Sequence, residues 1–242
     1  KNGHKEGPDG ATVKQNIRDL DKLLVQLNDK LDDDSALKDK LDIILFSDHG
    51  MAKLQDEKIN LLDYTEMTDY DKFLGSDADA QAMIWPAEGK EDNVYNALKR
   101  VDKLKVYKKD EIPDKYYLKR HYRVAPIVVE AEKGYVILKP GISTDTQKGT
   151  HGYDNTLSDM RGIFLARGPA FKEGYQKAGF VNVEVYNLMC YLMGLDPAPN
   201  NGWLCRMCDM LEDNCGLPTG AAVHTPHMAL SIMMGALIVS LG

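Results

Sequence analysis

Asp48 and His49 are the first neighbouring residues in the sequence whose chemistry could define a site. They follow Ile43 to Phe46, an unbroken apolar run typical of a strand buried on both faces of a parallel sheet. Asp48 could be an oxygen ligand or a base, and His49 is the commonest kind of nitrogen ligand for a transition metal. Side chains of neighbouring strand residues point to opposite faces. Asp48 and His49 can therefore reach one ion only if the chain leaves the strand at this point. Gly50 gives the backbone that freedom. A metal site beyond the end of the strand and a polar turn after a core strand both fit this pair.

Two further histidines lie in segments bounded by glycine. His4 lies within Gly3 to Pro8, which has the composition of a loop, and alone it reads as a solvated histidine. His151 lies within Gly149 to Asn155, after a segment from Pro140 that has no apolar period. Taken with Asp48 and His49, this set of nitrogen and oxygen ligands suits zinc. Two zinc ions about 3.5–4 Å apart can clamp the attacking and leaving oxygens of a phosphoryl transfer. We therefore expect the four side chains to converge on one two-ion site.

The elements that must position these residues can be predicted from hydrophobic periodicity. Apolar residues recur at helical spacing from Thr12 to Leu31, and the strand Ile43 to Phe46 follows, which is half of a doubly wound unit. Further helices are predicted at Asn93 to Val101 and Val183 to Met193, with Gly194 as the C-terminal cap of the latter. Strands are predicted at Ala80 to Trp85, Leu104 to Tyr107 and Gly162 to Ala166. Val124 to Val129 and Tyr135 to Leu138 are expected to form a hairpin through Lys133 and Gly134, whereas residues 52 to 80 are polar and irregular.

Composition and cysteine content limit the possible partners. The 242-residue chain has a net charge of -7, which argues against nucleic acid but not against small phosphate esters if metal ions supply positive charge. Its cysteines are Cys190, Cys205, Cys208 and Cys215. Cys205 and Cys208 have the spacing of a zinc or redox pair, but disulfides in a secreted protein fit the pattern better. No Asn-x-Ser/Thr sequon is present to add support for secretion.

The C-terminal residues Met228 to Gly242 are almost entirely apolar. This run of fifteen residues is shorter than the ~20 that span a bilayer, and no basic cluster follows it. Small residues at Asn214 to Gly216, the spacer Leu217 to His227 and the apolar tail together fit a glycosylphosphatidylinositol (GPI) anchor signal. Gly220 to Ala222 is an alternative attachment site, and a truncated transmembrane helix is the alternative interpretation of the tail.

Several motifs in order along the chain resemble the ectonucleotide pyrophosphatase/phosphodiesterases of the alkaline phosphatase superfamily. The resemblance extends from Lys1 to Gly202. The matching segments are Gly3 to Pro8, Phe46 to Met51, His151 to Asn155, Gly168 to Lys172, and Val185 to Cys190 continuing to Pro197 to Gly202.

The resemblance implies an α/β fold with an alkaline phosphatase-like sheet and helices on both faces, of which the N-terminal part is missing here. It implies that Asp48 and His49 hold the zinc that also binds the nucleophile, and that His4 and His151 hold the second zinc. The family places its Thr or Ser nucleophile upstream, so no catalytic nucleophile is assigned in this chain. We therefore expect the isolated chain to bind zinc weakly and not to turn over phosphodiesters.

The resemblance also suggests a substrate and a domain organisation. Met160 to Ala166, Trp85 to Lys90 and Trp203 to Met210 are most similar to the choline-specific glycerophosphodiester branch, whereas the short loop Pro140 to Lys148 is closer to nucleotide-hydrolysing members. We expect a zinc-dependent choline phosphodiesterase, with a nucleotide pyrophosphatase/phosphodiesterase or a catalytically dead adhesion module as alternatives. Residues 1–202 would belong to the catalytic domain, 203–227 to a cysteine-containing segment and spacer, and 228–242 to the lipid-anchor signal of an extracellular, membrane-attached protein. The oligomeric state is left open.

Overall fold

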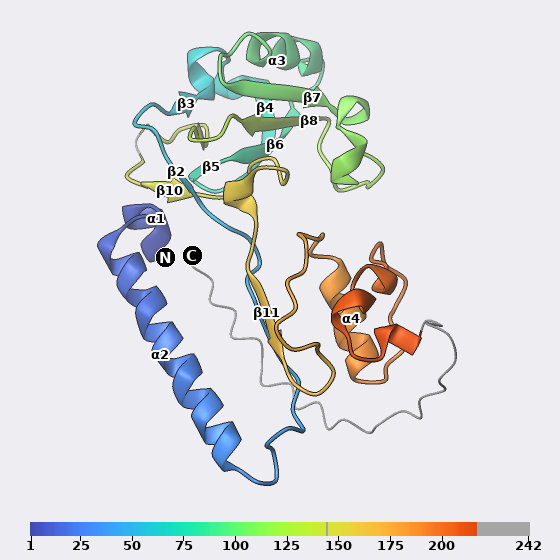
Figure 1. The fold of residues 1–242 in the computed structure, drawn as a ribbon. Coiled ribbons are helices and arrows are strands. Elements are labelled where there is room, and N and C mark those ends of the chain that lie inside the picture. Colours follow the sequence, from blue (N-terminus) through green and yellow to red (C-terminus); the bar gives the residue numbers. More distant parts are fainter. Residues whose placement is uncertain (144, 217–242) are drawn as a thin grey trace. The chain divides into compact units, whose positions relative to one another are not determined.

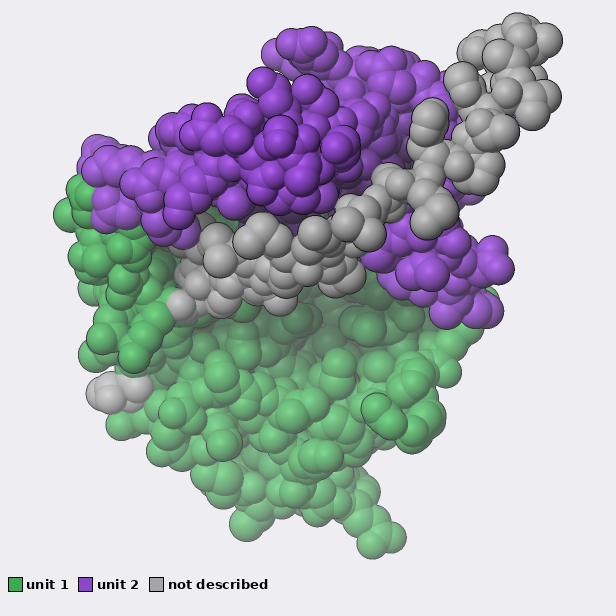
Figure 2. Space-filling model, turned by 90° about the horizontal axis from the view of Figure 1, so that it is seen from below, with its two compact units in different colours: residues 1–17, 49–161, 240–242 green, residues 18–48, 162–239 purple. Residues whose placement is uncertain are grey.

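The computed structural model describes residues 1–143 and 145–216. Within these ranges the chain forms two compact units, which Figure 2 shows in different colours. Unit 1 comprises residues 1–17 and 49–161, and unit 2 comprises residues 18–48 and 162–216. The predicted spacer and apolar tail lie outside the described residues, so the anchor signal stays a prediction. No helix in the part that is described has the length and apolar character needed to span a bilayer.

Figure 1 shows the helices and the mostly short strands of the described residues, with α1 and α2 at the start of the chain and α4 after the last strand. The helices are α1 Asn2–Glu6, α2 Ala11–Asp33, α3 Glu91–Leu98 and α4 Glu184–Leu192. The strands are β1 Ile43–Phe46, β2 Ala52–Lys53, β3 Ile59–Asn60, β4 Tyr70–Leu74, β5 Ala78–Asp79, β6 Gln81–Pro86, β7 Leu104–Lys108, β8 Ile127–Ala131, β9 Ile137–Leu138, β10 Gly149–Thr150 and β11 Phe164–Arg167. The predicted helices at 12–31, 93–101 and 183–193 and the strands at 43–46, 80–85 and 104–107 are confirmed, with no end shifted by more than three residues.

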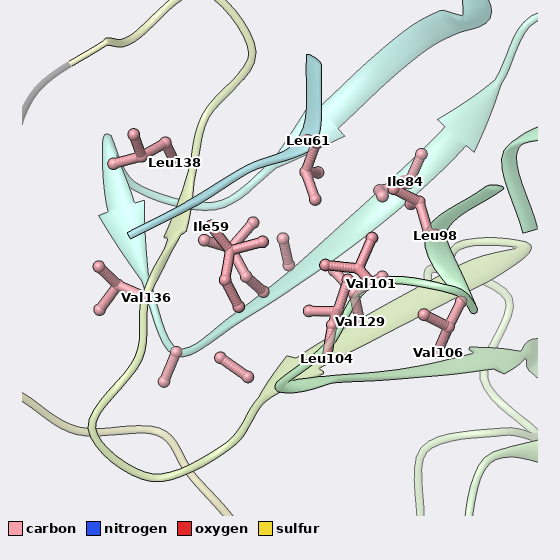
Figure 3. Close-up of a cluster of buried hydrophobic side chains, with 14 of the residues drawn as sticks. Ile59, Leu61, Ile84, Leu98, Val101, Leu104, Val106, Val129, Val136 and Leu138 are labelled. Carbon is pink, nitrogen blue, oxygen red and sulfur yellow. The ribbon is translucent and has the colours of Figure 1, made fainter. Parts of the chain in front are cut away.

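Unit 1 is built around a four-stranded antiparallel sheet with the order β4-β6-β8-β7. Helix α3 packs against β6 and β7, and its Val94 and Leu98 are fully buried. Figure 3 shows the cluster that results, in which side chains of these strands meet those of the small sheet β3-β9-β5. Because burying apolar surface is the main favourable term in folding, this cluster is the principal source of stability in unit 1.

The predicted hairpin between residues 124–129 and 135–138 is wrong. Lys133 and Gly134 do form a turn, closed by a hydrogen bond from the Tyr135 N–H to the Glu132 carbonyl. Both edges of β8 are already occupied, however, by β6 and β7. The segment after the turn therefore pairs elsewhere, and β9 lies parallel to β3 and antiparallel to β5.

Unit 2 contains a two-stranded ribbon in which β1 and β11 run antiparallel, with Ile43 opposite Arg167 and Phe46 opposite Phe164. The expectations of a parallel pairing and of complete burial are wrong for the described residues. All four residues of β1 are only partly buried, and β11 alternates between partly buried and exposed residues. Burial of a strand depends on what pairs with its edges and what packs on its faces, so its apolar composition alone did not determine it.

Helix α4 and the segment after it form a second, smaller core in unit 2. The helix ends as predicted at Gly194, whose φ of 65° lets the N–H groups of Gly194 and Leu195 bond to the Tyr191 and Cys190 carbonyls. Leu188 packs with Phe171, Met207, Met210 and Leu211. The Glu184 carboxylate is completely buried and accepts hydrogen bonds from Arg206 and from the Trp203 N–H.

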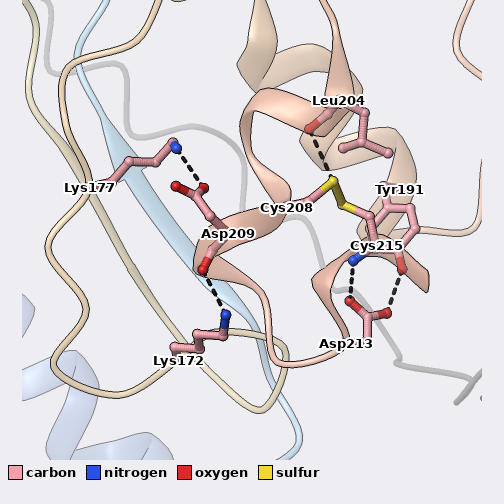
Figure 4. Close-up of a disulfide and its surroundings, with 8 residues drawn as sticks. All are labelled: Lys172, Lys177, Tyr191, Leu204, Cys208, Asp209, Asp213 and Cys215. Atoms are coloured by element: carbon pink, nitrogen blue, oxygen red, sulfur yellow. Dashed lines mark hydrogen bonds and ion pairs between the residues drawn. A yellow bond between two sulfur atoms is a disulfide. The ribbon is translucent and has the colours of Figure 1, made fainter. Parts of the chain in front are cut away.

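The predicted use of cysteine for a disulfide is confirmed by a bond between Cys208 and Cys215 (Figure 4). The disulfide closes a short loop whose Asp213 accepts hydrogen bonds from Tyr191 and from the Cys215 N–H. Burial and this hydrogen bond raise the pKa of Tyr191 to about 12. Cys205 is an exposed thiol and Cys190 a buried one, so the Cys205–Cys208 spacing does not mark a bonded pair.

Candidate metal site

His4 lies on a single turn of helix, α1, and not in the loop that its composition suggested. Gly7 ends this turn with a φ of 79°, and its N–H donates to the Gly3 carbonyl. The Lys148 N–H donates to the His4 carbonyl at 2.7 Å. A Cβ on Gly149 would lie 2.6 Å from the Gly3 carbonyl oxygen, so only glycine permits this close approach. Contacts with residues 148 and 149 stabilise this helical turn. The composition of Gly3 to Pro8 could not indicate contacts so distant in sequence.

His49 follows β1 at the point where the chain passes from unit 2 to unit 1. The Gly50 N–H donates to the Met160 carbonyl at 3.0 Å, and a Cβ on Gly50 would collide with the carbonyl oxygen of Asp159. The φ of Gly50 lies outside the left-handed region, so the glycine is needed for close backbone approach. The expectation that it supplies conformational freedom is wrong in this respect, and its effect is to hold His49 beside residues 159–161.

The ring hydrogen bonds of His4 and His49 define their tautomers. His49 Nδ1 lies 2.7 Å from the Gly50 carbonyl oxygen, and His4 Nδ1 lies 2.8 Å from Gln147 Oε1. Both partners are oxygen acceptors, so each Nδ1 is the donor, and in the neutral ring Nε2 is the nitrogen with the lone pair. Metal-bound histidines characteristically donate their other ring N–H to such an acceptor, which orients the ring and fixes the tautomer.

His151 begins a loop that is anchored both before and after this residue in the sequence. Upstream, β10 pairs with β2, and downstream the buried Tyr153 donates its hydroxyl hydrogen to the Tyr135 carbonyl at 2.7 Å. Burial raises the pKa of the Tyr153 hydroxyl, which therefore stays protonated as a donor. Asp154 accepts hydrogen bonds from Thr156 and from Lys115. Partial burial acts to raise the pKa of Asp154, but the Lys115 and Thr156 hydrogen bonds outweigh it and hold this pKa well below its usual range.

The structure brings three of the four predicted ligands together within unit 1. The rings of His49 and His151 stack with centroids 3.7 Å apart and an interplanar angle of 29°. The rings of His4 and His151 meet edge to face, with centroids 5.2 Å apart. The fourth predicted ligand, Asp48, belongs to unit 2, where its carbonyl accepts a hydrogen bond from Asn182 at 3.2 Å.

The chemistry of these donors fits zinc. Imidazole nitrogen is a preferred zinc donor, and the tautomers of His4 and His49 direct ligation through Nε2. Among residues 1–143 and 145–216, no three His, Cys, Asp or Glu side chains are arranged so that they could hold one ion. The roles of His4, Asp48, His49 and His151 as metal ligands therefore stay a prediction. Gln147 and Lys115 were not anticipated, because nothing in their local sequence marks them.

Comparison with known proteins identifies the class to which the fold and these motifs belong. The family model for type I phosphodiesterase / nucleotide pyrophosphatase matches residues 1–154. The chain is 38% identical over 211 residues to human ectonucleotide pyrophosphatase/phosphodiesterase family member 5, covering 87% of this chain and 43% of that protein. It is 34% identical to human family member 7, covering 89% of this chain and 48% of the relative. It is also 34% identical to the bis(5'-adenosyl)-triphosphatase of Mus musculus, covering 98% and 50% respectively.

Solved structures agree with these relatives. The human family member 5 structure superposes with a TM-score of 0.79 at 37% identity, covering 87% of this chain and 55% of that chain. Murine family member 5, whose inactive variant was solved in complex with AMP, also gives a TM-score of 0.79. The chain belongs to the ectonucleotide pyrophosphatase/phosphodiesterase family, and the predicted alkaline phosphatase-like α/β fold is confirmed. The chain spans about half the length of the curated relatives it matches.

Proposed function

We propose that this chain contributes metal ligands to a two-zinc phosphodiesterase in the complete protein. The observation that carries the proposal is the contact of the His4, His49 and His151 rings within unit 1, with two of them held in the tautomer that presents Nε2. His4 and His151 would hold one ion, and His49 with Asp48 the other. Family membership supports hydrolysis of phosphodiesters as the reaction.

Each part of this arrangement has a defined task in the proposed reaction. Bound zinc supplies positive charge that stabilises the attacking and leaving oxygens of a phosphoryl transfer. The Gly50 carbonyl orients the ring of His49 through its Nδ1–H group. The anchors at Tyr153 and Asp154 hold the loop of His151. The nucleophile would come from the part of the family fold that this chain does not match.

For the substrate, we propose a small phosphodiester of choline, such as glycerophosphocholine or a lysophospholipid. The support is the resemblance of Trp85 to Lys90, Met160 to Ala166 and Trp203 to Met210 to the choline-specific branch. A nucleotide substrate is the second candidate, favoured by similarity to a bis(5'-adenosyl)-triphosphatase and to a relative solved with AMP. The net charge of -7 continues to argue against polymeric nucleic acid as a substrate.

Product analysis on the complete zinc-loaded protein separates the candidates. Release of phosphocholine from glycerophosphocholine, at a kcat/KM at least ~10-fold above that for bis(5'-adenosyl) triphosphate, is the expected result, since one pocket contact is worth about 1–3 kcal/mol. The reverse preference would assign the protein to the nucleotide-hydrolysing members. Stoichiometric zinc without turnover of either substrate would indicate an adhesion or binding module. The His49→Ala protein is the control for contaminating hydrolases.

We also propose that the protein is extracellular and attached to the membrane by a GPI anchor. The Cys208–Cys215 disulfide supports an oxidising compartment, and the apolar tail after residue 227 supports the anchor. Phosphatidylinositol-specific phospholipase should release the protein from cells. Of the two attachment sites, Gly220 to Ala222 is the one that retains Cys215 and its disulfide, so the mature chain should end there and not at Asn214. Protein that stays on the membrane with residues 228–242 still attached would instead indicate a transmembrane helix.

A further inference from the structure

We propose that Gln147 is the positioning residue for His4, fixing its tautomer and ring orientation for binding metal through Nε2. This inference rests on the proposed zinc site, because it assigns a role to a residue that supports one of the site's ligands. It goes beyond the ligand set in naming the side chain that prepares His4 before metal arrives.

The orientation of the Gln147 amide follows from its two contacts. Its Nε2 donates to the Ala78 carbonyl at 3.2 Å, and its Oε1 lies 2.8 Å from His4 Nδ1. A carbonyl can only accept, so the Ala78 contact requires the amide nitrogen on that side and leaves Oε1 facing His4. His4 must therefore be the donor, and Nε2 of its ring is the nitrogen with the lone pair. Rotating the amide by 180° would set its oxygen against the Ala78 carbonyl and lose that hydrogen bond, so the Ala78 contact fixes which amide atom faces His4.

The backbone around Gln147 is held by a buried ion pair. The Gln147 N–H donates to Asp145 Oδ1 at 3.2 Å, and Asp145 Oδ2 lies 3.6 Å from Lys58 Nζ. The side chains of Asp145 and Lys58 are only 10% and 15% exposed. Asp145 Oδ2 is fully buried and has no hydrogen-bond partner among the described residues.

A buried ion pair of this kind is a poor source of stability. Removing both charges from water costs free energy that their attraction recovers only with good geometry and additional hydrogen bonds, and Asp145 Oδ2 has no such bond. The pair does have one clear structural consequence, which is that Asp145 fixes the backbone from which the Gln147 side chain reaches His4. We therefore interpret Lys58, Asp145 and Gln147 as a positioning network.

The same segment also positions the neighbouring ligand. Immediately after Gln147, the Lys148 N–H bonds to the His4 carbonyl, and β10 then leads directly to His151. Gln147 therefore holds the ring of His4, and Lys148 holds its backbone. His49 differs because its Nδ1 partner is the Gly50 carbonyl, which no side-chain substitution removes. Substitution of Gln147 can therefore test the tautomer of His4, whereas no substitution can do so for His49.

Zinc affinity of the complete protein tests the proposal, measured by competition with a chromophoric chelator. Gln147→Met keeps the length of the side chain but removes both hydrogen bonds, and it should weaken zinc binding about 10- to 100-fold. Gln147→Glu retains an oxygen acceptor toward Nδ1–H, so its affinity should stay within ~3-fold of wild type, given that carboxylates serve the same role beside metal-bound histidines. The exposed Gln55 is the matched control, and Gln55→Met should leave zinc affinity unchanged.

Unfolding of the metal-free proteins distinguishes positioning from a general structural role. The three variants should unfold at denaturant midpoints close to wild type, while only Gln147→Met loses affinity. Equal zinc affinity in wild type and Gln147→Met, or an equal loss in Gln147→Met and Gln147→Glu, would overturn the proposal. If the wild type binds zinc but hydrolyses no phosphodiester, the proposed function fails while the role of Gln147 can still be judged from affinity.

Discussion

The two units of this chain achieve their stability in different ways. Unit 1 has an extensive apolar cluster in which Leu61, Ile84, Ile127 and Val129 are fully buried. Unit 2 has a smaller cluster around Leu188 and adds two specific links, the Glu184–Arg206 pair and the Cys208–Cys215 disulfide. The predicted metal ligands of unit 1 lie on short segments that are held by hydrogen bonds to the backbone and to Gln147. We infer that substitutions at those segments should change metal binding more than stability, whereas breaking a link in unit 2 should do the opposite.

The largest expected effect is loss of activity in the complete protein when His49 or His151 becomes alanine. Metal stabilisation of charge in a phosphoryl transfer contributes several kcal/mol, so kcat/KM should fall by ~10³-fold or more. His121 provides a matched control in unit 1, because it is exposed and stacks on Tyr122. His121→Ala should keep wild-type activity. Retention of more than about a tenth of the activity by His49→Ala would contradict the assignment of this residue.

In unit 2, Arg206→Ala should give the largest loss of stability. Arg206 is 55% exposed, but it donates to the completely buried Glu184 carboxylate, which would keep only the Trp203 N–H, so its removal should cost about 3 kcal/mol in the free energy of unfolding. Arg167 pairs with Asp32 at the surface of the same unit, and Arg167→Ala should cost less than ~1 kcal/mol. Chemical denaturation monitors both. Equal effects of the two substitutions would show that burial of the Glu184 carboxylate does not distinguish its pair from the surface pair.

Removal of the disulfide should have the next largest effect. Cys208 and Cys215 are seven residues apart, and closing so short a loop stabilises the folded state by about 2.5 kcal/mol through the entropy of the unfolded chain. The double variant Cys208→Ala/Cys215→Ala should lose this amount, whereas Cys205→Ala, which removes an exposed thiol, should not. Zinc affinity should be unchanged in both variants. A large change in zinc affinity in the double variant would contradict the inference that this link in unit 2 affects stability more than metal binding.

The smallest effect is expected for Asp154→Asn, and it should depend on pH. The folded-state pKa of Asp154 is lowered, so its contribution is complete above the unfolded-state pKa near 3.9 and is lost as pH falls toward the folded value. The substitution should therefore cost about 1.5 kcal/mol at pH 6–8, and less at pH 3. Asp56, which is fully exposed beside Lys148, is the control, and Asp56→Asn should leave the free energy of unfolding unchanged at both pH values. A cost for Asp154→Asn that is the same at pH 3 and pH 7 would argue against the ion pair with Lys115.

The sequence predicted elements well where a long apolar period dominates. The periodic residues between Thr12 and Leu31 and between Val183 and Met193 located α2 and α4 closely. The sequence did not predict strand pairing correctly, because pairing depends on the partner strand. β1 was expected to be parallel because its composition is apolar, and its antiparallel pairing depends on β11, more than a hundred residues away. The segment 135–138 was assigned to the wrong neighbour because strand composition does not reveal which sheet edges are already occupied.

The candidate site was predictable in part for the same reason. His4, Asp48, His49 and His151 could be singled out because metal-binding residue types occur beside glycines in a recognisable family pattern. Gln147 could not, because its role depends on a contact with His4 across 143 positions of sequence. Lys115 likewise becomes relevant only through its contact with Asp154.

The most direct test of the account is a zinc-edge anomalous difference map from crystals of the complete protein. We predict two zinc peaks, with Nε2 of His49 about 2.0–2.1 Å from one and Nε2 of His4 and His151 at the same distance from the other. The Nδ1–H groups of His4 and His49 should keep their contacts with Gln147 and the Gly50 carbonyl. Zinc bound instead at Cys205 or elsewhere, or ligation of His4 or His49 through Nδ1, would contradict the central claim.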